Sequence, residues 1–220
     1  MTLLVTGSAG HLGEALIRTF RAEGIAARGI DLQRTAFTDA SGSVADRAFV
    51  RDAMQGVRAV LHTAALHKPH VGSHDRQAFV DTNVSGTLNL LEEAVAAGVE
   101  AFVFTSTTSA LGRALSPPPE APAAWITESV APVPKNIYGV TKVAAEDLCE
   151  LMHRLTRLPI VVLRTSRFFP EDDDDPDARA ERSGDNLRAN EFLYRRVDLD
   201  DVVDAHRCAL AAAPRLGFGR

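Results

Sequence analysis

The segment TLLVTGSAGHLG, residues 2–13, carries the clearest signal for the fold. A short apolar run leads directly into glycines at positions 7, 10 and 13, and a helical pattern follows from near Leu12. Glycines allow a tight turn and a close backbone approach, and the free N–H groups at the start of a helix attract anions. The segment predicts a strand, a turn and a helix that can hold the pyrophosphate of a dinucleotide, although the spacing is G-x-x-G-x-x-G rather than G-x-G-x-x-G. A glycine-rich turn without a ligand is the alternative.

The chain continues with the same alternation of short apolar runs and amphipathic stretches. Strands are expected over residues 2–6, 25–31, 59–65, 101–107 and 160–166, and helical patterns over 11–24, 46–56, 83–98 and 138–156. Alternating strand and helix signals predict an α/β fold, a doubly wound parallel (Rossmann) sheet with helices on both faces.

Two loop-like stretches interrupt the alternation, LSPPPEAPAAW at 115–125 and an acidic stretch at 168–186. A strand and helix pattern resumes after the second stretch. We therefore expect an NAD-binding Rossmann domain over residues 1–164, a small C-terminal substrate lobe over 165–196, and a returning strand and helix over 197–220. The run Asp172–Asp175 lacks the regular spacing of a calcium loop and is more simply a solvated loop.

Composition excludes several classes of protein. The 220 residues include 24 basic and 29 acidic side chains, a net charge of -5, without a Lys/Arg-rich run, so nucleic acid is not an expected partner. The N-terminus lacks the features of a signal peptide, and no run approaches the ~18 apolar residues of a membrane span. Cys149 and Cys208 stand in helical, alanine-rich surroundings, which argues against a disulfide framework or a zinc site. A cytoplasmic enzyme without a membrane partner is expected.

Asp31 ends the second expected strand, about 20 residues past the glycines. A carboxylate there can accept hydrogen bonds from an adenosine ribose and repel a 2′-phosphate, so NAD is favoured and NADP is less likely. Arg28 and Arg34 are close in sequence and could accommodate a phosphate instead. A strand-end carboxylate in a turn is the alternative without a ligand.

The catalytic signal is YGVTK, in which Tyr138 and Lys142 stand four apart on one face of an expected helix. A free phenol has a pKa near ~10. A fixed ammonium and a cationic nicotinamide would both favour phenolate, and lowering the pKa by ~3 units requires ~4 kcal/mol of preferential stabilisation.

With the glycine turn, Asp31, FTSTTSALG and YGVTK in this order, the chain resembles the extended short-chain dehydrogenase/reductase family, in its group of NAD-dependent sugar epimerases and dehydratases. The resemblance covers about residues 2 to 210. It implies that Tyr138 is the general acid/base, that Lys142 also holds the nicotinamide ribose, and that Thr107 places a hydroxyl on the substrate oxygen. Ser106 and Thr108 are neighbours that could take the role of Thr107.

The resemblance also implies a set of residues that contact NAD: Gly7, Gly10, His11, Leu12, Gly13, Asp31, Val44, Ala64, Ala65, His67, Asn83, Tyr138 and Lys142. Two departures from the family matter. Ser43 and Val44 stand where the family usually has an Asp before a hydrophobic residue, which predicts weaker adenine binding. Thr108 and Ser109 replace the acidic pair of the dehydratases, so elimination of water lacks its proton donor.

The segment after Arg164 governs the substrate. Family members commonly continue further than this chain, and the compact uronate dehydrogenases of the same superfamily are similar in the segment RTSRFFP, residues 164–170. A small sugar acid is therefore an alternative substrate, with Arg167, Arg179 or Arg182 as candidate carboxylate partners. The early end of the chain would also be explained if the sequence were shortened relative to a longer protein.

The sequence thus predicts an NAD-dependent oxidoreductase or epimerase that transfers a hydride to or from a secondary alcohol or ketone of a sugar-like substrate. The alternatives are a uronate dehydrogenase and a non-catalytic dinucleotide-binding regulatory or scaffold protein. The resemblance implies a homodimer through the helices of residues 83–98 and 138–156. His62, His67, His70 and His74 cluster without a regular ligand spacing, so no metal is predicted. Asp200 and Asp201 are expected to cap and start the last helix.

Overall fold

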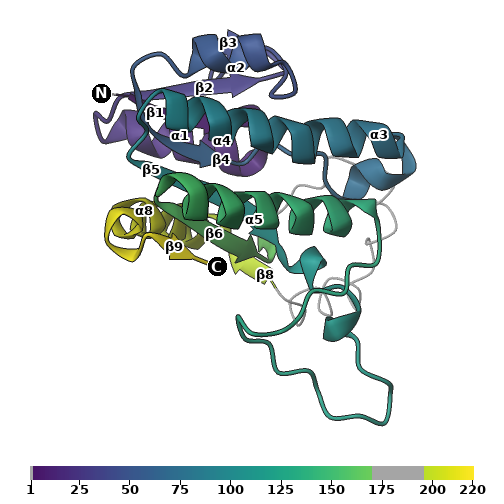
Figure 1. The fold of residues 1–220 in the computed structure, drawn as a ribbon. Coiled ribbons are helices and arrows are strands. Elements are labelled where there is room, and N and C mark those ends of the chain that lie inside the picture. The colour runs from purple at the N-terminus through teal and green to yellow at the C-terminus, as the bar shows by residue number, and fades with distance from the viewer. Residues whose placement is uncertain (1, 170–195) are drawn as a thin grey trace.

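The structure, a computed structural model, describes residues 2–169 and 196–220. A parallel sheet of seven strands runs through the centre, with helices on both faces (Figure 1). Its order is β3-β2-β1-β4-β5-β6-β9, and every neighbouring pair is parallel. The strands are β1 (Thr2–Thr6), β2 (Ala27–Asp31), β3 (Ala40–Ser41), β4 (Val57–His62), β5 (Ala101–Thr107), β6 (Ile160–Thr165) and β9 (Phe218–Gly219). The predicted doubly wound α/β fold is confirmed.

The helices form two layers. One layer holds α1 (His11–Ala22) and α8 (Leu199–Leu216), which pack against each other, and the other holds α2 (Arg47–Ala53), α4 (Gly86–Ala96) and α5 (Ile137–Thr156). The short helix α3 (Arg76–Phe79) and a π-helical segment, Val80–Ser85, lead directly into α4. Figure 1 shows α4 and α5 side by side across the front of the sheet.

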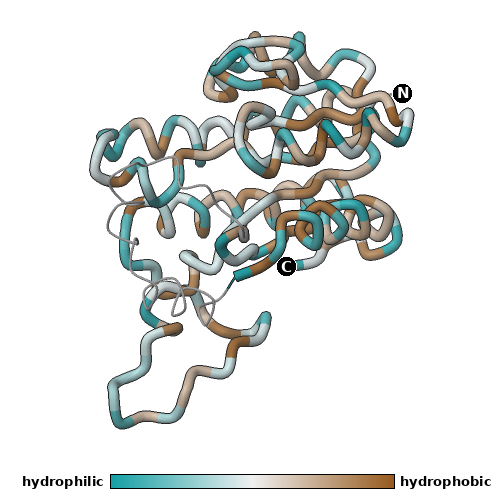
Figure 2. Tube along the Cα trace, turned by 180° about the vertical axis from the view of Figure 1, so that it is seen from behind, coloured by the Kyte–Doolittle hydropathy of each residue, from teal (hydrophilic) through white to brown (hydrophobic). Residues whose placement is uncertain are grey.

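The core follows from the strand period of two. On β5 every residue is buried, and Phe102 and Phe104 face α4 and α5 while Val103 faces α8. Full burial of one such side chain contributes about 1.5 to 3 kcal/mol before the entropy of folding is counted. Figure 2 shows hydrophobic stretches concentrated in the central strands. A central strand buried on both faces is typical of a parallel sheet.

Helix starts are fixed by side-chain caps. The Asn136 amide oxygen accepts a hydrogen bond from the Gly139 N–H at the start of α5, and the Asp198 carboxylate accepts one from the Asp200 N–H at the start of α8. Asp200 and Asp201 lie in the first turn of α8, where their negative charges interact favourably with the positive end of the helix dipole. The cap of α8 is therefore Asp198, and the prediction that the later pair caps this helix is wrong.

The C-terminal residues return to the sheet. Helix α8 packs on β5 and β6, and β9 pairs with β6. The structure describes the two ends of the expected lobe. One end holds the strand β7 (Arg167–Phe169), and the other holds Arg196, the first residue of β8 (Arg196–Asp198). Strands β7 and β8 form a parallel pair. Residues 170–195, with Arg179, Arg182 and the run Asp172–Asp175, lie outside the described residues. In residues 2–169 and 196–220, no helix is both long and apolar enough to cross a bilayer.

Candidate active site

The glycine turn lies where the strand order reverses. From β1 the chain proceeds to β2 on one side, whereas β4, its neighbour on the other side, leads to β5. Gly7 ends β1 with φ +72°, and a Cβ on it would stand 2.7 Å from the backbone N of Ala64, just past β4. Ligands of open α/β sheets bind at such a switch point, outside the carboxyl ends of the strands.

Glycine is needed for a different reason at each of the three positions of the turn. A Cβ on Gly13 would stand 2.0 Å from the Gly7 carbonyl oxygen, so the internal packing of the protein excludes any larger residue. A Cβ on Gly10 would meet only that same oxygen, at 3.4 Å. Gly10 is also the N-cap of α1 and offers no side chain to the first N–H groups. Open space at Gly10 and an uncapped helix start fit a pyrophosphate.

The other predicted residues of this turn differ in what they expose. The Leu12 side chain is buried in the core between α1 and α8, so only its backbone faces the turn, whereas His11 is exposed. Ala64 and Ala65 are partly buried at the end of β4, and His67 beyond them is exposed. All of these residues lie at the carboxyl edge of the sheet.

Asp31 reaches the same edge from β2. Its Oδ2 accepts a hydrogen bond from the Ala9 N–H at 3.1 Å, and its Oδ1 accepts one from the Gln33 N–H at 2.9 Å. Each carboxylate oxygen has a further lone pair, so the group can still accept from ribose hydroxyls. The contact with Ala9 places the carboxylate directly beside the glycine turn.

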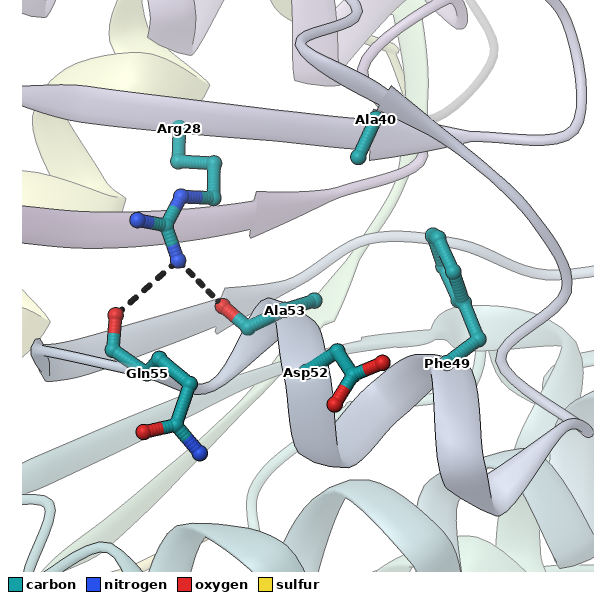
Figure 3. Close-up of a pocket in the computed structure, with 6 residues that line it drawn as sticks. All are labelled: Arg28, Ala40, Phe49, Asp52, Ala53 and Gln55. Carbon is teal, nitrogen blue, oxygen red and sulfur yellow. Dashed lines mark hydrogen bonds between the residues drawn. The ribbon is translucent and has the colours of Figure 1, made fainter.

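Arg28 points away from this site. Its guanidinium donates to the carbonyl oxygens of Ala53 at 2.6 Å and Gln55 at 3.0 Å, at the C-terminal end of α2 (Figure 3). A guanidinium bound to helix-end carbonyls is not available to a 2′-phosphate beside Asp31. The interpretation of Arg28 as a phosphate partner is therefore wrong. Arg34, the other candidate, is exposed.

Val44 and Asn83 are both buried. A Cβ on Gly86 of α4 would stand 2.6 Å from the Val44 Cγ2, which shows how closely the two pack. The Asn83 side chain accepts from the Leu66 N–H and donates to the Leu66 carbonyl oxygen and the Thr141 hydroxyl. In this arrangement Asn83 positions the segment after β4 against α5.

Thr107 and Tyr138 meet where β5 ends and α5 begins. Gly139 makes this possible, because a Cβ on it would stand 2.7 Å from the carbonyl oxygen of Ser109, in the turn that follows Thr107. The hydroxyl of Thr107 accepts a hydrogen bond from the Ser109 N–H and lies close enough to the half-buried Tyr138 phenol to lower its pKa. The two groups that the sequence assigns to the substrate oxygen are thus adjacent.

Burial raises the pKa of Tyr138 above its ordinary value, and the neighbouring Thr107 hydroxyl acts in the opposite direction. The predicted lowering of this pKa by Lys142 is not seen in the structure. The protein's own residues therefore favour the neutral phenol.

Lys142 is buried, with 2% of its surface exposed. Its ammonium donates to the Thr105 carbonyl oxygen at 2.6 Å and lies 4.3 Å from the centre of the Phe104 ring. Burial lowers the pKa of Lys142 to about 8, while Cys149 and Glu146 act to raise it. These contacts hold the ammonium against β5.

Ser106 does not face the substrate side. Its hydroxyl donates to the buried Glu146 carboxylate at 2.5 Å, on the α5 side of β5. We therefore do not assign Ser106 to the substrate. Thr108 is partly buried beside Thr107, and Arg167 begins β7 just past the end of β6, where it makes contacts of its own.

A long loop projects from this edge of the sheet (Figure 1). Its base is closed by a bridge between Gly112 and Val133, in which the Arg113 N–H donates to the Val133 carbonyl oxygen at 2.8 Å. Gly112 has φ +52°, and a Cβ there would stand 2.1 Å from that oxygen. The bridge holds the loop containing the predicted 115–125 segment next to Thr107 and Tyr138.

The four clustered histidines separate into two groups. His62 is buried between the Thr6 and Thr87 hydroxyls at 2.8 and 2.9 Å, whereas His67, His70 and His74 form edge-to-face ring contacts on the loop after β4. Within residues 2–169 and 196–220 no group of three His, Cys, Asp or Glu side chains is arranged to hold a metal ion.

Several residues that shape the site are not predicted from the sequence. Gly139 and Glu146 stand one and eight residues after Tyr138 on the same helix, and a carboxylate four residues past Lys142 was a detectable signal. The contacts of His62 with Thr6 and Thr87 join residues 56 and 25 positions apart, which no local pattern reveals.

Comparisons with known proteins agree with this geometry. The model of the NAD dependent epimerase/dehydratase family matches residues 3–216. A UDP-glucose 4-epimerase of Rhizobium meliloti is 33% identical over 171 residues, 74% of this chain and 50% of the relative. Sterol demethylase protein B of Methylococcus capsulatus is 42% identical over 120 residues, 51% of this chain and 36% of the relative.

Among solved structures, a short-chain dehydrogenase/reductase superfamily protein of Agrobacterium tumefaciens with bound NAD has a TM-score of 0.78 and 28% identity. The match covers 96% of this chain and 74% of that one. The chain spans between 36% and 66% of the length of five similar curated proteins. The family model covers nearly all of it, and the chain therefore belongs to the NAD-dependent epimerase/dehydratase family.

Proposed function

We propose that the protein is an NAD-dependent oxidoreductase or epimerase that moves a hydride to or from a secondary alcohol or ketone of a sugar-like substrate. The observation that carries the proposal is the Thr107–Tyr138 contact, at the same edge of the sheet as the glycine turn and Asp31. NAD-binding proteins and UDP-glucose 4-epimerases among the relatives support the cofactor and the substrate class.

The chain's own residues supply proton transfer and positioning. In the reductive direction the neutral Tyr138 phenol donates a proton to the ketone oxygen, and in the oxidative direction the phenolate removes the hydroxyl proton. The Thr107 hydroxyl orients the same oxygen. Gly7, Gly10, Gly13, Asp31 and Lys142 would hold NAD, which supplies a hydride acceptor when bound.

The test begins with calorimetric titration of the protein with NAD and NADP. A screen of sugars, sugar acids and nucleotide sugars then measures absorbance at the reduced-nicotinamide band, and chromatography detects epimers formed without net reduction. Binding of NAD without turnover of any of these substrates would favour a regulatory or scaffold protein. Oxidation of a sugar acid would favour the uronate alternative, for which Arg167, the first residue of β7, is the described carboxylate candidate.

Tyr138→Phe should lower kcat by about 10²-fold or more and leave the Kd for NAD nearly unchanged, because the proton donor alone is removed. Thr107→Val should lower kcat as well, whereas Thr108→Val, its matched neighbour, should not. Unchanged turnover in Tyr138→Phe contradicts the mechanism, and a larger loss in Thr108→Val would move the role of Thr107 to Thr108.

The proposal includes a homodimer, a substrate lobe over 165–196 and a cytoplasmic location. Val95, Val140, Leu151 and Leu155 are exposed on α4 and α5, which supports pairing of these helices between two copies. The free thiols of Cys149 and Cys208 fit a reducing compartment. In light scattering after size exclusion, Leu155→Glu should give a monomer, whereas Leu216→Glu, an exposed leucine of α8, should not change the mass.

A further inference from the structure

A buried ionic cluster lies behind Lys142, on the side of β5 that faces α5. Glu146 has no exposed surface, and its Oε1 accepts hydrogen bonds from the Ser106 hydroxyl at 2.5 Å and from Arg164 Nε at 3.0 Å. Its Oε2 accepts from an Arg164 terminal nitrogen at 2.7 Å. We call Ser106, Glu146 and Arg164 the Glu146 cluster.

The cluster ties together the three elements that carry the proposed chemistry. Ser106 precedes Thr107 on β5, Glu146 is on α5 with Tyr138 and Lys142, and Arg164 is on β6. The Ser106–Glu146 hydrogen bond therefore fixes the end of β5 to the middle of α5. A hydrogen bond to a carboxylate is about twice as strong as one between neutral groups.

Glu146 also stands one helical turn after Lys142, on the same face of α5. Both side chains are buried, so water screens their attraction weakly. The other ionisable groups around the ammonium are Cys149 on α5 and His62 on β4, and burial lowers the pKa of His62 and raises that of Cys149. Because both therefore stay neutral near pH 7, Glu146 is the nearby anion. Two cations offset it: Arg164, at 2.7 Å from Oε2, and the more exposed Arg220, at 3.8 Å from the same oxygen.

We propose that Glu146 is a positioning residue that holds the proton on Lys142 and fixes Thr107 relative to Tyr138, with Arg164 setting the strength of its charge. This inference deepens the proposed function, in which Lys142 holds NAD, because a neutral Lys142 would no longer supply positive charge to the nicotinamide ribose. Its electrostatic part concerns the protein alone and can be measured without cofactor or substrate.

The pKa of Lys142 can be measured without signal overlap because the chain has only three lysines, Lys68, Lys135 and Lys142. In protein labelled with ¹³C at lysine Cε, each lysine gives one NMR signal that shifts when the ammonium loses its proton. Lys142→Met assigns the buried one by its disappearance. Lys68 and Lys135, both exposed, serve as internal references.

Three variants separate charge from packing. Glu146→Gln keeps an acceptor for Ser106 but removes the charge, so the pKa of Lys142 should fall by about one unit or more. Arg164→Met removes the opposing charge, so the pKa should rise. The double variant should return the pKa toward the wild-type value, a pattern that loss of packing alone does not produce. Ser106→Ala should leave the pKa within about 0.3 units while speeding amide hydrogen exchange at Thr107.

An unchanged Lys142 pKa in Glu146→Gln, or shifts of the same sign in Glu146→Gln and Arg164→Met, overturns the proposal. If Glu146→Gln does not fold, the direction of the shift in Arg164→Met decides alone. These titrations can be interpreted whether or not the protein turns over a sugar, so they test the role of Glu146 even if the proposed function is wrong. Once a substrate is known, Glu146→Gln should move the basic limb of the kcat profile to lower pH by the same amount, and an unmoved limb contradicts the catalytic part.

Discussion

The side-chain amide of Asn83 forms two hydrogen bonds with the main chain of Leu66, one to its N–H and one to its carbonyl oxygen, each 2.9 Å long. An adjacent strand would satisfy the same two groups in this way. Asn83 therefore substitutes for a strand where β4 ends and the chain turns past the expected cofactor.

Asn83→Ala should lower the free energy of unfolding by about 2 to 4 kcal/mol, because it leaves partly buried backbone groups of Leu66 unpaired. Urea unfolding measures the loss. The Kd for NAD should rise as well, since Ala64 and Ala65 lie in the segment that Asn83 holds. Gln77→Ala removes an exposed amide that bonds only to Asp81 and should change stability by less than about 0.5 kcal/mol. Equal losses in both variants would count against this role for Asn83.

Gly10→Ala and Gly13→Ala form a matched pair of substitutions. At Gly13 the added carbon stands 2.0 Å from the Gly7 oxygen, so unfolding should become easier by about 3 kcal/mol or more. At Gly10 the space is open on the protein side, and the loss should stay near or below about 1 kcal/mol. Calorimetry should nevertheless show weaker NAD binding in Gly10→Ala. Wild-type affinity in that variant would mean that the pyrophosphate does not approach Gly10.

Asp31 should control the choice between NAD and NADP. Asp31→Ser removes the carboxylate that repels a 2′-phosphate, so the ratio of NADP to NAD affinity should rise about tenfold or more. A tenfold change in this ratio corresponds to about 1.4 kcal/mol of binding free energy. Arg28→Met should leave this ratio unchanged, because Arg28 binds the carbonyl oxygens at the end of α2. Competition binding with both dinucleotides compares the two variants, and a changed ratio in Arg28→Met would return that arginine to the cofactor site.

His62 should stay neutral well into the acid range. The single proton of the Thr87 hydroxyl is donated to the Asn83 carbonyl oxygen, so Thr87 accepts from His62 Nε2–H, and His62 Nδ1 accepts from the Thr6 hydroxyl. Burial, then the nearby Lys142 charge, hold the pKa of His62 well below its ordinary value. ¹⁵N NMR should show the Nε2–H tautomer at pH 7, and the opposite tautomer would contradict this chain of donors.

The same shift makes stability depend on pH. Below pH 6.5 the unfolded chain binds a proton on His62 that the folded chain does not, so stability falls as pH falls, by up to about 1.4 kcal/mol per pH unit from this residue. His62→Gln should unfold more easily at pH 7 but show a shallower decline from pH 6.5 to pH 5. A parallel decline in both proteins would assign the effect to other groups, such as the buried His206, whose pKa burial also lowers.

The architecture could be predicted from the sequence because it depends on local patterns. The glycine turn, the strand ending in Asp31 and the helix of Tyr138 and Lys142 each lie within one short segment, and parallel strands bring their carboxyl ends to one edge. The predictions that were wrong depend on the direction in which a side chain points from its strand. Arg28 and Asp31 share one strand but point to different surroundings, and Ser106 faces α5 rather than the substrate. Alternation along a strand places Arg28 and Asp31 on opposite faces, but only the packing of the sheet determines which elements each face meets.

Helix α8 has a consequence for how the chain is synthesised. Arg207 of α8 pairs with Glu23, the C-cap residue of α1, 184 positions earlier, and Ala209 and Ala213 cover Val103 and Val161 on the sheet. During translation that apolar face of β5 and β6 leaves the ribosome long before α8 does. Until residues 199–216 emerge, the nascent chain exposes a hydrophobic surface that a chaperone could bind, so folding is completed only after translation of that helix.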